Sequence, residues 1–151
     1  MQVWTPHVTV ATVIEHQDRY LLVEERDKFT GAMVFNQPAG HLEPEETLAQ
    51  AAIRETLEET GWEVELLGIL GVALYRAPGN NITYYRTTFL GKPLCRIEEA
   101  TLDPDIHMTH WLDYGQILAR REQMRSPMVI SDIRRHRAGT LYPLDLVSAI
   151  I

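Results

Sequence analysis

Residues 40–62 read GHLEPEETLAQAAIRETLEETGW, and this stretch decides the fold. Within it, a set of charged residues stands at fixed spacing between Gly40 and Gly61: Glu46, Arg54, Glu55, Glu58 and Glu59. At about 100° per residue, the last three glutamates project from one arc of roughly 100° on a single helix. Carboxylates crowded on one face repel each other, and a bound divalent cation would relieve that repulsion.

The helix in this stretch is predicted to begin near Glu45 or Glu46 and to end at about Thr60. Pro44 and the early glutamates suit a helix N-terminus, where proline costs little and the helix dipole favours negative charge. Gly61 is a natural C-cap. The side opposite the acids carries a mostly apolar stripe that can pack on a sheet: Leu48, Ala52, Ile53, Thr56 and Leu57.

Strands are predicted on both sides of this helix. β-Branched and apolar runs indicate strands at 7–14, 20–25, 64–75, 82–90 and 106–112, with a short extended piece at 33–38. Gly91 to Pro93 are expected to end the run at 82–90. Amphipathic segments at 114–122 and 127–137 predict two further helices. With no repeat or linker in the chain, the pattern predicts one mixed α/β (α+β) domain over residues 1–151.

Composition narrows the class of protein. The 151 residues are 45% hydrophobic and 23% charged, as in ordinary globular proteins. The net charge of −7 argues against binding a nucleic-acid polymer, and an acidic protein that handles an anionic substrate needs metal ions. Cys95 is the only cysteine, so no internal disulfide is expected. No signal-peptide pattern or membrane span is visible, so we expect a cytoplasmic protein with no membrane partner.

The acids of the helix are candidate metal ligands. Glu55 lies three residues before Glu58 and four before Glu59, so the three side chains are neighbours. Carboxylate oxygens suit Mg²⁺, with Mn²⁺ as a substitute. Gly40 allows close backbone approach and offers a carbonyl oxygen to the metal. An acidic helical run is more often a solvated face, but so many fixed positions argue against chance.

These positions resemble the signature box of the Nudix hydrolases, which use a divalent metal to cleave diphosphate linkages attached to another moiety. The resemblance implies the Nudix fold, a mixed β-sheet sandwiched between helices. Two positions depart from the family pattern. Thr56 replaces a residue that is usually aliphatic, and Trp62 is larger than the usual apolar residue. Thr56 is expected on the packing side, so its departure concerns helix packing and not chemistry.

The flanking sequence resembles the NudJ-type phosphatases within this family. The similar segments are PHVTVA, FNQPAGHLEPEETL, RSPMV and YPL, at residues 6–11, 35–48, 125–129 and 142–144. The resemblance implies a small-molecule diphosphate as substrate, notably hydroxymethylpyrimidine diphosphate or thiamine diphosphate with release of phosphate. Nucleoside di- and triphosphates are implied as further substrates.

The resemblance also implies roles for individual residues. Glu58 and Glu59 are the leading metal ligands, together with the Gly40 carbonyl, and Glu55 is either a third ligand or the group that orients water. The catalytic residues are Glu55, Glu58 and Asp105, with Glu98 and Glu99 as competitors of Asp105. Glu46 and Arg54 are expected to brace the loop and helix. Substrate contacts are expected from Asn36, Gln37, His41 and Tyr85, and other aromatics that offer stacking are Trp4, Phe35 and Tyr84.

Other readings stay open at this point. A pyrophosphohydrolase acting on nucleoside triphosphates or nucleotide derivatives would carry the same box. A Nudix-fold binding or regulatory module without turnover would be expected to lose one of Glu55, Glu58 and Glu59, and all three are present. An acidic interaction helix on an unrelated fold would leave Gly40 and Gly61 unexplained. The chain is expected to be a monomer or a homodimer.

Overall fold

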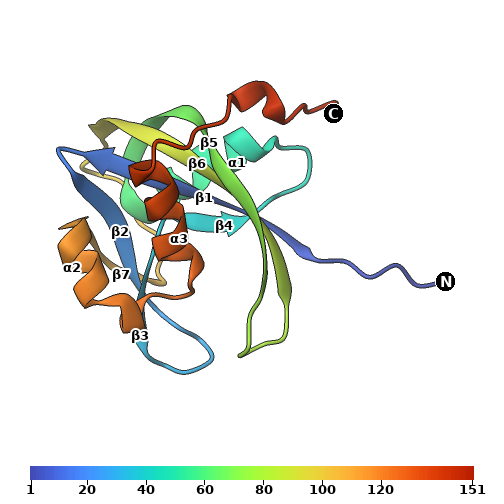
Figure 1. The fold of residues 1–151 in the computed structure, drawn as a ribbon, viewed down its shortest axis with the longest axis horizontal. Helices are drawn as coiled ribbons and strands as arrows, with labels where there is room; N and C mark the ends of the chain where they lie inside the picture. The colour runs from blue at the N-terminus through green and yellow to red at the C-terminus, as the bar shows by residue number, and fades with distance from the viewer.

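A computed structural model describes residues 1–151, and its centre is one mixed sheet of seven strands (Figure 1). The strands are β1 (His7–His16), β2 (Arg19–Arg26), β3 (Met33–Asn36), β4 (Ala39–His41), β5 (Trp62–Arg76), β6 (Thr83–Arg96) and β7 (Ile106–Asp113). The helices are α1 (Leu48–Thr60), α2 (Tyr114–Ala119) and α3 (Met128–Arg137), with short 3₁₀ turns η1 (Arg121–Gln123) and η2 (Leu144–Leu146). The α+β class and the predicted order of elements are confirmed.

Strand β1 divides the sheet. Its first eight residues run parallel to β6, and Thr9 to Ala11 also pair antiparallel with β4. Only the last two residues of β1 pair with β2, which continues to β3 and β7. The sheet order is β3-β2-β1-β6-β5, with β4 on β1 and β7 on β2. Gly40 in β4, where the signature box begins, therefore lies where the two halves of the sheet separate.

Helices cover both faces of the sheet, as the sandwich prediction requires (Figure 1). Val10 and Val13 differ in parity along β1, so their side chains point to opposite faces. Val10 belongs to the cluster beneath α1, which comprises Val10, Ala51, Ala52, Ile69 and Phe89. Val13 belongs to the larger cluster beneath α2 and α3, which comprises Val13, Tyr20, Leu22, Phe35, Leu70, Leu112, Ile117, Val129 and Ile133.

Helix α1 begins later than predicted. Its N-cap is Thr47, whose side chain accepts from the Gln50 N–H at 3.0 Å while Gln50 accepts from the Thr47 N–H at 2.9 Å. This reciprocal capping box outcompetes the proline and the acids as the start signal. Glu45 has a φ of 66°, and the first turn of the helix holds no acid. At the other end, Gly61 caps the helix with a φ of 75°, as predicted.

The packing side of α1 is also rotated from the prediction. Ile53 is 41% exposed, whereas Ala51, Ala52 and Thr56 are buried. The buried stripe continues to Glu59, so one of the box glutamates lies on the packing side. Thr56 fits there because its hydroxyl donates to the Ala52 carbonyl at 2.8 Å, which satisfies the polar group inside the helix.

Two further boundaries differ from the sequence prediction. Strand β6 continues through Gly91 and Pro93 to Arg96. Pro93 is tolerated because β6 pairs with β1 only as far as Gly91, and the β5 register shifts between Glu63 and Val64 beside it. Helix α2 ends at Ala119 and is followed by η1, so the predicted 114–122 helix is two elements. None of the helices combines the length and apolar composition that a membrane crossing requires.

Candidate functional site

Arg54 is the centre of the polar contacts around the signature box. Its guanidinium holds Glu46 through two hydrogen bonds, from Nε at 3.0 Å and from an amino nitrogen at 2.7 Å. It also donates to the His41 carbonyl at 3.1 Å, to Glu55 at 2.9 Å and to Glu58 at 3.3 Å. These contacts tie the loop after β4 to α1, which is the geometry that the predicted bracing role of Glu46 and Arg54 requires.

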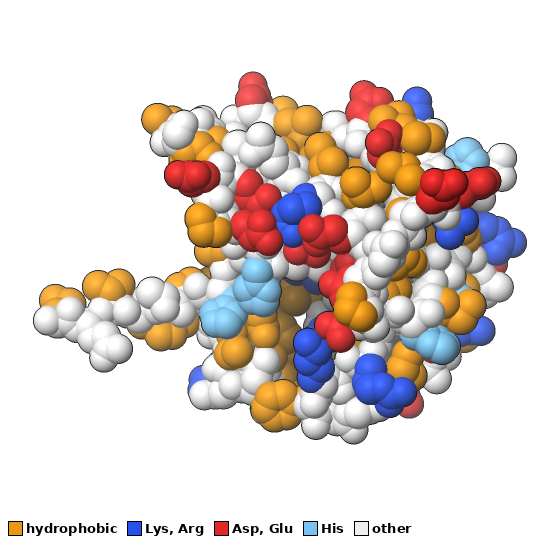
Figure 2. All heavy atoms as spheres, turned by 180° about the vertical axis from the view of Figure 1, so that it is seen from behind, with side chains coloured by type: hydrophobic (Ala, Val, Ile, Leu, Met, Phe, Trp, Pro, Cys, Tyr) orange, Lys and Arg blue, Asp and Glu red, His pale blue; other side chains and the backbone are white.

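The charges around Arg54 do not balance. One guanidinium forms ion pairs with four acids: Glu43, Glu46, Glu55 and Glu58. The bidentate contact with Arg54 holds the pKa of Glu46 below its usual range. In the view from behind, acidic side chains surround a basic one beside a hollow in the surface, and two histidine side chains lie next to them (Figure 2). The surface here has an excess of negative charge.

Gly40 makes room for Glu55. A Cβ atom at residue 40 would fall on the Glu55 carboxylate, so any side chain there would displace it. Burial raises the pKa of Glu55, and the charges of Glu58 and Asp103 add to the shift against the opposing effect of Arg54. The glycine is therefore required by close packing against a carboxylate.

Glu59 is the buried acid of the box, with 7% of its surface exposed. One carboxylate oxygen accepts from the Ala39 N–H at 2.8 Å, and no cationic side chain pairs with it. Burial, together with the charges of Glu25, Glu55 and Asp103, raises the pKa of Glu59 to about 9. A buried carboxylate among other acids is costly unless a cation joins it.

The residues fit a divalent metal by their chemistry. The donors around Glu59 are carboxylate oxygens, the ligands that Mg²⁺ and Mn²⁺ prefer. In this structure no three acid, histidine or cysteine side chains converge on one point as ligands. Arg54 accounts for this, because it draws Glu55 and Glu58 toward itself. A metal would need these two side chains to turn from the guanidinium toward Glu59.

Burial raises the pKa of Glu25, and the charge of Asp105, the predicted acid on the later loop, adds to that shift. Asp105 pairs with Lys28 at 3.1 Å, and its side chain is 53% exposed. Asp103 is closer to the box, since its N–H donates to the Glu58 carbonyl at 2.9 Å and its charge raises the pKa of both Glu55 and Glu59.

The four residues predicted to contact the substrate differ in burial and in their hydrogen-bond partners. Asn36 and Gln37 are 7% and 1% exposed, and both amides bond to Arg86. His41 is exposed and one ring nitrogen lies 3.0 Å from a ring nitrogen of His7. Tyr85 is 40% exposed on β6.

The remaining aromatic candidates also differ in setting. Tyr84 packs edge-on against His7 and His41, so it belongs to the histidine cluster. Phe35 lies in the core beneath α2 and α3, whereas Trp4 is 68% exposed.

Sequence reasoning missed four polar residues that the structure brings toward the site. They are Glu25, Arg86, Asp103 and Asp132. Glu25 is the second glutamate after the apolar run YLLV of β2. Arg86 interrupts the strand ITYYRTTFL, where a charge among apolar residues was the available signal. Asp103 and Asp132 carried no comparable signal, since acids in a loop and on an amphipathic helix are usually solvated.

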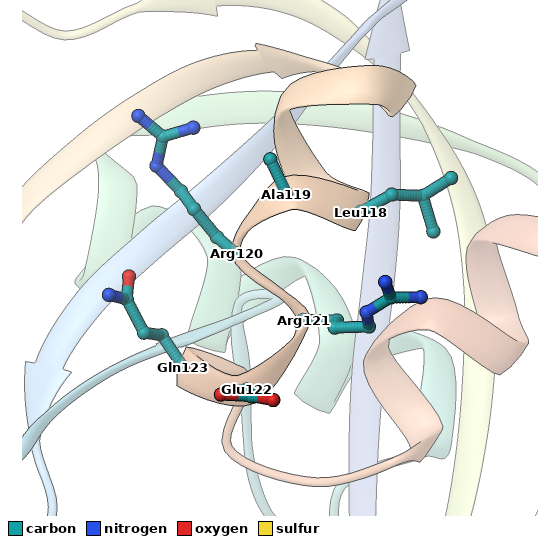
Figure 3. Close-up of a pocket in the computed structure, with 6 residues that line it drawn as sticks. All are labelled: Leu118, Ala119, Arg120, Arg121, Glu122 and Gln123. Carbon is teal, nitrogen blue, oxygen red and sulfur yellow. The ribbon is translucent and has the colours of Figure 1, made fainter.

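A second feature of the surface is a shallow groove of about 340 Å³ along α2 and η1 (Figure 3). It is lined by Leu118, Ala119, Arg120, Arg121, Glu122 and Gln123. None of these residues belongs to the signature box. The groove therefore lies apart from the acids of α1 and contributes nothing to them.

Comparison with known proteins defines the class. The model of the NUDIX domain matches residues 5–131, and the chain belongs to this family. It is a hydrolase that acts on phosphorus-containing anhydrides. Members of the family generally use a divalent metal.

Individual relatives place the chain more closely. It is 37% identical over 148 residues to Phosphatase NudJ of Escherichia coli strain K12. This alignment covers 94% of this chain and 90% of the relative. A NUDIX hydrolase from Nitrosomonas europaea is 41% identical and superposes with a TM-score of 0.93, covering 97% of this chain and 98% of that one. A MutT NUDIX hydrolase from Burkholderia pseudomallei shares the fold at 19% identity, with a TM-score of 0.73 and coverage of 87% and 98%.

Proposed function

We propose that the chain hydrolyses a diphosphate linkage in a small organic diphosphate, with Mg²⁺ as the working cofactor and Mn²⁺ as a substitute. The preferred substrate is hydroxymethylpyrimidine diphosphate or thiamine diphosphate, from which phosphate is released. Nucleoside di- and triphosphates are further substrates. The observation that carries the proposal is the similarity to Phosphatase NudJ, which extends over 94% of the chain and so includes residues outside the signature box. Residues 1–151 act here as one catalytic unit.

Glu55, Glu58 and Glu59 would hold the cation, with the Gly40 carbonyl as a further ligand. When bound, the cation neutralises phosphate charge and makes water a better nucleophile. Arg54 keeps its two bonds to Glu46 and its bond to the His41 carbonyl when Glu55 and Glu58 turn away. The loop after β4 therefore keeps its shape while the acids change partner.

The proton of the attacking water needs a carboxylate acceptor. Glu55 and Glu58 are the candidates on α1, and burial raises the pKa of Glu55, which makes it a stronger base than an ordinary glutamate. Outside the helix the candidate is Asp105, with Asp103 as its competitor because the charge of Asp103 acts on Glu55 and Glu59. The proton then goes to one of these carboxylates while the phosphorus–oxygen bond of the anhydride breaks.

The organic part of the substrate would lie beside the box. Asn36 offers an amide next to Gly40 along the chain, His41 offers a ring nitrogen, and Tyr85 offers an exposed ring for stacking. Gln37 is buried with both ends of its amide bonded inside the protein, so the predicted substrate contact is replaced by a supporting role for this side chain.

A substrate screen tests this proposal. The purified chain is incubated with Mg²⁺ and hydroxymethylpyrimidine diphosphate, thiamine diphosphate, nucleotides or nucleotide-sugars, and the products are followed by ³¹P NMR. We expect orthophosphate from the pyrimidine and thiamine diphosphates at the highest kcat/KM. Equal release by wild type and Glu58→Gln would refute the metal site. A marked preference for nucleotide-sugars, with cleavage inside the diphosphate, would instead favour the nucleotide-derivative pyrophosphohydrolase.

A further inference from the structure

Strand β6 carries an arginine inside the protein. Arg86 is 4% exposed and lies between the sheet and α3. Its charge is matched by Asp132 of α3, with 3.1 Å between the guanidinium nitrogen and the carboxylate oxygen. The same carboxylate oxygen accepts from the Thr88 hydroxyl at 2.7 Å. A buried ion pair contributes little net stability compared with apolar packing. The other contacts of Arg86 therefore indicate what this residue does.

Those other contacts are the two amides that precede the signature box. Arg86 donates to the side-chain oxygen of Gln37 at 2.6 Å and to that of Asn36 at 3.4 Å. A guanidinium has donors only, so each amide must turn its oxygen toward Arg86 and its nitrogen away. Amide orientation is often ambiguous in a protein, and here the cation decides it.

The side-chain nitrogens of Gln37 and Asn36 differ in their hydrogen-bond partners. The Gln37 nitrogen donates to the Val129 carbonyl at 2.8 Å, so both ends of this side chain are bonded inside the protein. Asn36 pairs with Val23 across β2 and β3, so it is a diagonal neighbour of Glu25 on the same face of the sheet. An amide nitrogen carries two hydrogens, and no hydrogen bond within the protein uses those of Asn36.

Glu25 connects this chain of contacts to the acids of the box. It pairs with Arg125 at 3.0 Å, and its side chain is 12% exposed. Its charge acts on Glu59. Hydrogen bonds therefore lead from Asp132 through Arg86 to Asn36, which neighbours Glu25 at the edge of the acidic group.

We propose that Arg86 is a positioning residue for substrate recognition. Held by Asp132, it keeps the oxygen of Asn36 inward, so that the amide nitrogen faces Glu25 and donates to an acceptor atom on the organic part of the substrate. This inference rests on the proposed function and deepens it. The site selects diphosphates whose organic part carries an acceptor, such as a ring nitrogen or a carbonyl oxygen.

The test uses a variant in which both members of the ion pair are replaced, Arg86→Met/Asp132→Leu, because removal of one member alone leaves a buried charge. Hydroxymethylpyrimidine diphosphate, whose ring nitrogens are acceptors, is compared with methyl diphosphate, which has no acceptor outside its phosphates. We expect KM for the pyrimidine substrate to rise about tenfold, the effect of one lost hydrogen bond, with little change in kcat. Neither parameter should change for methyl diphosphate. Arg96→Met, on the exposed end of β6, is the matched control.

An equal loss of kcat/KM on both substrates would overturn the proposal, because it would mean that Arg86 only supports the fold. Thermal unfolding of each variant is measured first. Should the double variant not fold, Arg86→Lys, which keeps a cation toward Asp132 but lacks the planar fork that reaches the amides, takes its place with the same expected split.

A second measurement needs no turnover. In ¹⁵N-labelled protein, the side-chain amide signals of Asn36 are identified by their loss in Asn36→Leu. We expect their hydrogen exchange to be slow in wild type and about tenfold faster in the double variant. Unchanged exchange would show that Arg86 does not hold the amide. If wild type hydrolyses neither diphosphate, the proposed function fails while the exchange data still decide the positioning role.

Discussion

Two charged regions on either side of the sheet differ in how their charges are balanced. Beside α1, Arg54 meets four acids, and Glu59 is buried with one backbone N–H as its partner. Beneath α3, Arg86 meets one acid and three neutral side chains. The first region has more acids than bases, and the proposed cation would balance it. The second is already neutral and acts as support. The same pair of residue types is therefore unbalanced beside α1 and balanced beneath α3.

Breaking the balanced region should have the largest effect on stability. Arg86→Met leaves the carboxylate of Asp132 buried without its cation, which should lower the free energy of unfolding by about 3–5 kcal/mol. Urea unfolding followed by circular dichroism measures this change. Arg86→Met/Asp132→Leu should recover most of the loss, because no charge is then left inside. A double variant as unstable as the single one would show that the ion pair is not the relevant interaction.

Changing the unbalanced region should affect catalysis and leave the fold unchanged. Glu58 is half-exposed, so Glu58→Gln should shift stability by less than about 0.5 kcal/mol. Its kcat/KM with Mg²⁺ should fall on the order of 10²–10³-fold, the usual effect of removing one charged group from a reaction centre. Glu65→Gln, an exposed glutamate on β5, is the matched control. If both variants keep wild-type rates, the acids of α1 are only a solvated face.

The packing of the unbalanced region can be tested at Gly40. In Gly40→Ala, the new methyl group would meet the Glu55 carboxylate. Overpacking of this kind should cost about 1–3 kcal/mol. In the Glu55→Ala background the same change should cost much less. Urea unfolding gives the cost in each background, and the difference between the two costs is the coupling between residues 40 and 55. Equal costs in both backgrounds would place the strain in the backbone and not in the carboxylate.

The sequence predicted what depends on local spacing. The box positions, the C-cap at Gly61 and the contacts of Arg54 with acids nearby in the chain all follow from residues within one turn or one loop. The start of α1 was also local, but two signals competed there. The Thr-x-x-Gln capping box prevailed over Pro44 and the early glutamates because it satisfies two backbone N–H groups at once.

Contacts between distant strands could not be predicted from spacing. Asn36 and Gln37 were selected because they precede the box, yet their orientation is set by Arg86, about fifty residues later in the chain. Asp132 meets Arg86 only because α3 returns over β6. Glu25 and Asp103 approach Glu59 through strand pairing and a loop, which one sequence does not reveal.

Helix α3, which supplies Asp132 to the balanced region, also carries a histidine that should make the free energy of unfolding depend on pH. This is the smallest of the expected effects. His136 of α3 lies 2.7 Å from the Tyr20 hydroxyl, and burial holds its pKa below the ordinary value near 6.5. The unfolded chain therefore takes up a proton at higher pH than the folded chain. The stability contributed by neutral His136 is complete above about pH 6.5 and is lost as the pH falls through the folded pKa. Unfolding of wild type and His136→Gln between pH 8 and pH 5 measures this loss. The two free energies should converge toward acid pH, since glutamine cannot be protonated. Parallel curves would mean that His136 titrates alike in both states, and that the support beneath α3 is insensitive to pH at this contact.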